Sequence, residues 1–101
     1  MFEISRSAPR VQVEGVRPLE KNERGILLQG ARLVCESIQD NDMERWMLTE
    51  GGQFIRQTGK DVYVTDAAFA LEFLPGFCDD EVMEQLVAAN AFEGAISVPK
   101  P

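Results

Sequence analysis

The sequence predicts an α+β fold: a small curved antiparallel sheet of four or five strands with two C-terminal helices. Three observations lead to this prediction. The chain has 101 residues, of which 45% are hydrophobic, so we expect one core and a single domain over residues 1–101. Short strand-like runs separated by turn residues fill the middle of the chain. Two helix-like segments then close it, and such segregation of strands and helices is typical of α+β proteins.

The first strand signal lies close to the N-terminus. Val11-Gln12-Val13 alternates apolar with polar residues, so residues 10–16 are expected to form a half-buried strand. Gly15 is expected to bulge this strand and Pro18 to end it.

The next segment is ambiguous. Residues 20–25 are polar and are expected to form a turn, whereas residues 26–38 fit either a helix or a strand. Gly25 and Gly30 favour the strand, because each glycine costs a helix about 1 kcal/mol relative to alanine.

A strand meander is the clearest supersecondary signal. A turn of Asp and Asn residues at 39–42 precedes it, and glycine-containing turns separate its members. Its expected strands are residues 45–49, 53–56 and 62–65. The single tryptophan, Trp46, lies within this meander, where a core position is favoured over a role as an interface anchor.

Two helices are expected after the meander. Thr65 or Asp66 can cap the first helix, which Pro75-Gly76 ends. The second is expected to run from Asp79 to about Ala91, with an apolar side formed by Val82, Met83, Leu86 and Val87. The tail Ala95–Val98 is expected to add a short edge strand.

The formal net charge of −7 is unevenly distributed. Residues 1–32 hold six basic and four acidic side chains, whereas the remainder holds four basic and thirteen acidic ones. Phosphate repulsion disfavours direct nucleic-acid binding by such a surface. The charge therefore predicts a protein partner with a basic surface.

Several functional classes lack the residues they require. The chain contains no histidine, the commonest general base and transition-metal ligand, so we expect no catalysis and no cofactor. Cys35 and Cys78 stand far apart, which favours two reduced thiols over a disulfide. No apolar run approaches the roughly 20 residues of a membrane span, and the N-terminus lacks a signal-peptide pattern. We therefore expect a cytoplasmic protein without membrane contact.

One acidic run partly matches a calcium loop. Asp40, Asp42 and Glu44 alternate as ligands do in such loops, but Arg45 and Gly51 occupy positions that require glycine and glutamate. A solvated turn is favoured over a metal site. The residues expected to contact a basic partner are Asp79, Asp80, Glu81 and Glu84, together with Asp40, Asp42 and Glu44.

Part of the chain resembles a family of small phage proteins. Gly52-Gln53-Phe54-Ile55-Arg56, then Thr58-Gly59-Lys60 and Val62-Tyr63-Val64, followed by Phe69 and Phe73, resemble the PGDYL-type segment of phage and prophage proteins. The resemblance covers about residues 50–75 and departs at Gly51-Gly52-Gln53, where the family has Pro-Gly-Asp. It implies a phage or mobile-element origin and no particular chemistry.

Together these observations predict a small acidic interaction protein that inhibits or modulates a larger protein by occupying its basic surface. Two alternatives stay open. One is a homodimeric or larger accessory assembly, paired through an exposed edge strand. The other is a domain that binds a small ligand without catalysis.

Overall fold

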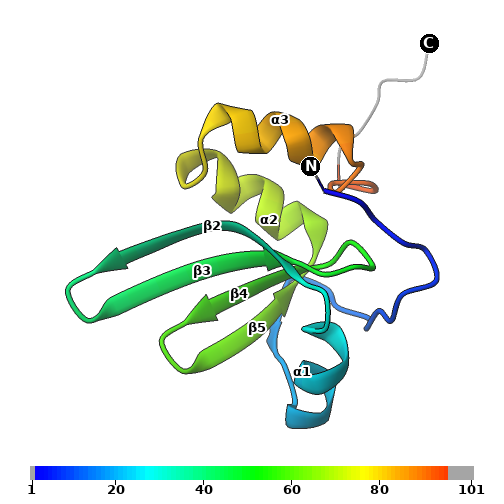
Figure 1. Ribbon diagram of the computed structural model, residues 1–101, viewed down its shortest axis with the longest axis horizontal. Helices are drawn as coiled ribbons and strands as arrows, with labels where there is room; N and C mark the ends of the chain where they lie inside the picture. The colour runs from blue at the N-terminus through cyan, green and yellow to red at the C-terminus, as the bar shows by residue number, and fades with distance from the viewer. Residues whose placement is uncertain (1, 96–101) are drawn as a thin grey trace.

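The computed structural model describes residues 2–95 and confirms the α+β prediction. Its sheet has five antiparallel strands in the order β1-β5-β4-β3-β2. These are β1 (Val16–Pro18), β2 (Arg32–Gln39), β3 (Asp42–Leu48), β4 (Phe54–Thr58) and β5 (Asp61–Thr65). The helices are α1 (Lys21–Leu27), α2 (Ala67–Phe73) and α3 (Asp80–Ala88), with a 3-10 turn, η1 (Leu74–Gly76), between the last two. Figure 1 shows α2 and α3 stacked over one face of the sheet and α1 on the opposite side of it.

The central strand, β4, packs against residues on both faces of the sheet. Phe54 joins a cluster with Trp46, Leu74, Leu86 and other residues of the helical layer. Its neighbour Ile55 points to the opposite face, as successive strand residues do, and packs with a second cluster. That cluster comprises Leu19, Leu27, Ile55, Val62 and Val64. Trp46 has no exposed surface, which confirms its predicted core position.

The N-terminal region differs from the prediction in two elements. The strand expected at residues 10–16 begins only at Val16, because the backbone of Val11 bonds to the Gln53 side chain rather than to a neighbouring strand. The turn expected at residues 20–25 is instead the first part of α1. Glu23 stabilises this helix start by accepting a hydrogen bond from the backbone N–H of Glu20 at 3.0 Å.

The ambiguous segment contains both kinds of structure. α1 ends at Leu27 and β2 begins at Arg32, so the strand prediction is correct for most of residues 26–38. Gly30 lies between them with φ +72°, a left-handed conformation that glycine adopts readily. The C-terminal helix is shorter than expected, ending at Ala88, and Val87 is 49% exposed rather than buried. The predicted edge strand Ala95–Val98 lies almost wholly outside the described residues.

The two cysteines form a disulfide, so the prediction of reduced thiols is wrong. Cys35 on β2 is joined to Cys78, which directly precedes the N-cap of α3, with 6.0 Å between their Cα atoms. The bond fastens the start of α3 to the sheet. Sequence spacing could not reveal it, because the two residues meet only when the helical layer folds back over β2.

Candidate functional site

Four of the predicted partner-binding residues lie together at the start of α3. Asp79 is the N-cap, and its Oδ1 accepts a hydrogen bond from the backbone N–H of Val82 at 2.9 Å. Asp80, Glu81 and Glu84 continue the first turns of the helix, and all four residues are exposed. Within residues 2–95 none of them forms an ion pair. We call Asp79, Asp80, Glu81 and Glu84 the acidic face.

The other three predicted residues do not join this face. Asp40 and Asp42 are exposed at the tip of the β2–β3 hairpin, which Figure 1 places apart from the helical layer. Glu44 is half-buried and already paired, since its Oε1 accepts from Nε of Arg56 at 2.9 Å. The Arg56 guanidinium also lies 4.7 Å from the centre of the Phe73 ring, a cation–π contact. Glu44 thus neutralises a cation between the sheet and α2.

A cleft of about 1120 Å³ lies along the described part of the chain. It lies between the N-terminal segment, the β3–β4 turn, the start of α2 and the turns that follow α3. No residue of the acidic face lines it. The lining includes the arginines Arg6, Arg10 and Arg17 and the acidic residues Glu14, Asp66 and Glu93.

Two pairs of polar contacts hold the N-terminal wall of the cleft in place. The Gln53 side chain accepts from the backbone N–H of Val11 at 2.8 Å and donates to its carbonyl at 2.6 Å. Asp66 accepts from the N–H of Gly15 at 2.7 Å while its other carboxylate oxygen caps α2. Gly51 permits close approach of this wall, because a Cβ there would lie 2.8 Å from Cγ of Arg10.

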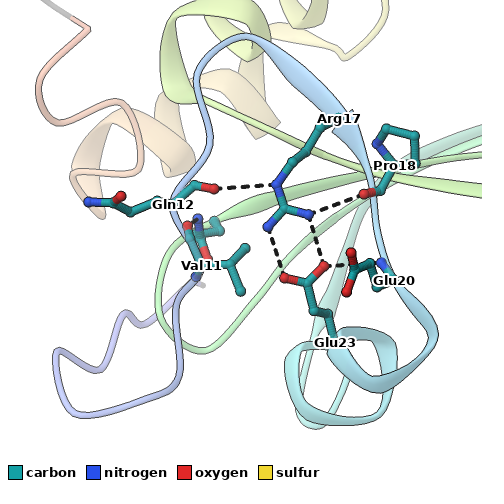
Figure 2. Close-up of polar contacts among 7 residues, drawn as sticks. Val11, Gln12, Arg17, Pro18, Glu20 and Glu23 are labelled. Carbon is teal, nitrogen blue, oxygen red and sulfur yellow. Dashed lines mark hydrogen bonds and ion pairs between the residues drawn. The ribbon is translucent and has the colours of Figure 1, made fainter.

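Arg17 is fixed at the edge of the cleft by Glu23 (Figure 2). Its two terminal nitrogens donate to the two carboxylate oxygens, each at 2.8 Å. Hydrogen bonding from Arg17, aided by the backbone N–H of Glu20, lowers the pKa of Glu23 from 4.5 to about 2. The same hydrogen bond raises the pKa of Arg17. Arg17 is therefore a structural cation rather than a free ligand-binding group.

The remaining polar groups of the cleft were not predicted from the sequence. Arg6 and Arg10 form no ion pair or hydrogen bond through their side chains with other described residues. Thr65 is 1% exposed, and its buried hydroxyl has no hydrogen-bond partner among the residues that the structure describes. The basic excess of residues 1–32 was the only available signal for this site.

Within residues 2–95 the structure contains neither a candidate metal cluster nor a candidate membrane-spanning helix. No group of three or more His, Cys, Asp or Glu side chains in this range is placed to hold a metal ion. None of the helices in the same range is long and apolar enough to cross a bilayer. Comparisons with protein-family models, with curated proteins and with solved structures find no match.

Proposed function

We propose that this chain is a small acidic binding protein that docks on a basic surface of a larger protein and thereby inhibits or modulates it. The observation that carries the proposal is the exposed acidic face, whose carboxylates have no cationic partner within residues 2–95. Carboxylates without cationic partners in their own chain are available to pair with the lysines and arginines of another protein. The proposed action is binding without catalysis or a bound cofactor.

The outer side of α3 also resembles a binding surface in its pattern. Asp80, Glu84 and Val87 follow one another at spacings of four and three, so they share one side of the helix. Val87 is 49% exposed, which places an apolar contact beside the carboxylates. An apolar contact rimmed by charge is the usual composition of a protein interface.

The partner class follows from the charge. Surfaces that bind nucleic acid are rich in lysine and arginine, and a row of carboxylates can occupy them in place of phosphates. A nucleic-acid-handling protein is therefore the partner that we propose. The resemblance of residues 50–75 to PGDYL-type phage proteins accords with a phage or mobile-element inhibitor of a host protein.

The proposal is tested by charge-neutralising variants of matched size. Asp79 is kept because it caps α3, so the test variant is D80N/E81Q/E84Q and its control is E3Q/D61N/E72Q. The control residues are exposed and lie outside the acidic face, and their substitution removes the same charge. A partner captured from the source organism should be identified and its affinity for each purified variant measured at several salt concentrations.

We expect the test variant to bind that partner at least tenfold more weakly than the control, with less salt dependence. Equal affinities of the two variants would contradict the proposal.

A cytoplasmic location is part of the proposal, and the disulfide between Cys35 and Cys78 is the observation against it. Disulfides persist in oxidising compartments and are rare in the cytosol. Rapid alkylation of intact cells, followed by mass analysis of the chain, distinguishes a cytoplasmic protein with reduced cysteines from a protein in an oxidising compartment. Two alkylated cysteines would support the cytoplasm, whereas an unmodified pair would place the protein in an oxidising compartment.

Self-association is a second candidate function, favoured by the open edge of β2. Within residues 2–95 this eight-residue strand pairs only with β3, and it exposes Leu33 by 51% and Ile38 by 64%. Such an edge can pair with a second copy of itself. Light scattering coupled to size exclusion should then give twice the chain mass, and L33K/I38K should give the monomer mass.

A further inference from the structure

The cleft contains charges that no contact within the described chain neutralises. Arg6 and Arg10 lie on its N-terminal wall without a carboxylate partner, and Glu14 and Glu93 line the same cleft without a cationic one. The other two charged lining residues are already occupied. Arg17 is paired with Glu23, and Asp66 accepts backbone hydrogen bonds at both carboxylate oxygens. Two free cations and two free anions therefore face a common space.

Thr65 is a second, independent observation that points to a ligand in the cleft. It lines the cleft beside Phe54, its partner residue across the β4–β5 ladder. Its hydroxyl is buried and has no partner among residues 2–95, although buried polar atoms nearly always have one. The buried Nε atoms of Arg24 and Trp46 likewise lack partners, but neither residue lines the cleft.

The dimensions of the cleft favour a short peptide over a single amino acid. Arg10 and Glu14 are four positions apart in the sequence, a span of at most about 14 Å along the N-terminal wall. A fully extended tetrapeptide covers a similar length. The volume of the cleft, about 1120 Å³, also exceeds the usual volume of pockets for small molecules, roughly 300–1,000 Å³.

We propose that the cleft binds a short zwitterionic peptide, with its carboxylate at Arg6 and Arg10 and its ammonium group at Glu14 and Glu93. The hydroxyl of Thr65 then donates to a carbonyl of the bound chain. The apolar residues that line the cleft suit small apolar side chains on the peptide. These lining residues are Ile4, Val11, Val13, Phe54 and Ala91. The proposal does not depend on the acidic face, because none of its residues lines the cleft.

The test is an NMR titration of the labelled protein with tetra-alanine that has free termini. We expect saturable shifts of backbone amides confined to the residues that line the cleft, with an affinity in the millimolar range or tighter. Tetra-alanine blocked by an N-acetyl and a C-amide group, and free alanine, should each bind at least tenfold more weakly. Equal binding of the blocked peptide, or the absence of saturable shifts with the free one, would overturn the proposal.

Variants identify the groups responsible. R6Q/R10Q should weaken the affinity for free tetra-alanine at least tenfold, whereas K21Q/K60Q, which alters exposed lysines outside the cleft, should leave it unchanged. Thr65→Val should weaken binding several-fold. The amide spectrum of each variant also reports whether it is folded, and if Thr65→Val is not, the arginine pair carries the test. Wild-type affinity in R6Q/R10Q would contradict the assignment.

D80N/E81Q/E84Q should bind the peptide like the wild-type protein. The experiments therefore test partner binding by the acidic face and peptide binding by the cleft separately.

Discussion

The side chain of Glu23 has two structural roles. It holds Arg17 beside the cleft, and it also closes the first turn of α1. Its pKa of about 2 lies below the usual 4.5, so the ionised form is favoured by folding. This contribution to stability is fully present above about pH 4.5 and is lost as the pH falls towards 2. The difference in unfolding free energy between the wild-type protein and Glu23→Gln should therefore be largest above pH 5 and should shrink towards pH 2.

Denaturant unfolding of both proteins between pH 6 and pH 2 measures this difference. Because both proteins share every other acidic side chain, the comparison with Glu23→Gln isolates the Arg17 pair. A difference that stays constant over the whole range would show that this ion pair is not the source of the pH dependence.

Replacing either of two buried threonines with valine should change the unfolding free energy in opposite ways. Thr49 Oγ1 accepts from the backbone N–H of Gln53 at 3.0 Å, whereas the hydroxyl of Thr65 has no partner within residues 2–95. Thr49→Val leaves a buried N–H unpaired and should reduce the unfolding free energy by about 1–3 kcal/mol. Thr65→Val removes an unsatisfied hydroxyl and should leave stability unchanged or raise it by about 1 kcal/mol. Thermal and denaturant unfolding of the two variants provide the check, and an equal loss in both would show that Thr65 is satisfied.

Single residues were predictable from the sequence where their neighbours along the chain decided their role. Trp46 was placed in the core from its position in a strand, and Asp66 was predicted as one of two alternative helix caps. The ligand groups of the cleft were not predicted, because Arg10 and Thr65 lie on segments that only the fold brings together. Charge counting located the basic excess but could not identify which arginines stay unpaired.

At the scale of the structural elements, we expect the disulfide to make a large contribution to stability. It links β2 to the start of α3 across a sequence separation of 43 residues. A loop of this length, closed in the unfolded chain, should contribute about 4 kcal/mol to stability on chain-entropy arguments. Urea unfolding of the wild-type protein with and without a thiol reductant should show this loss. The C35S/C78S variant should already lack it and should not respond to the reductant.

Reduction of the disulfide should also loosen the structure locally. Because Cys78 directly precedes the N-cap of α3, reduction should increase hydrogen exchange in α3 more than in β4 or β5. Uniform acceleration over the whole domain, or no change in α3, would show that packing alone fixes this helix.

Element boundaries followed the sequence wherever turn residues marked them. The β2–β3 turn at Asp40, with φ +54°, and the glycine turn before β4 lie where Asp, Asn and Gly predicted them. α1 was missed because its seven residues contain Gly25, and its stability comes from burial of Leu27 and from the contacts of Glu23 rather than from helix propensity. Propensity therefore failed where tertiary contacts outweighed it.

At the scale of the whole molecule, the uneven charge of the sequence becomes a separation in space. The basic N-terminal third supplies the three arginines of the cleft, and the acidic remainder supplies the acidic face and the tip of the β2–β3 hairpin. An overall charge of −7 would repel an anionic group from most of the surface. Arginines gathered beside the cleft give the carboxylate end of a peptide a local site of attraction.

The two hydrophobic clusters should nevertheless unfold as one unit. They share the sheet, and the consecutive residues Phe54 and Ile55 belong to different clusters, so neither can separate without disrupting β4. Leu27→Ala changes only the cluster beneath α1, and its cavity should cost about 2–5 kcal/mol. The fluorescence of Trp46 reports on the opposite cluster, yet its unfolding midpoint should fall together with that of the far-ultraviolet circular dichroism. A midpoint of Trp46 fluorescence unchanged by Leu27→Ala would instead divide the sheet into two independent halves.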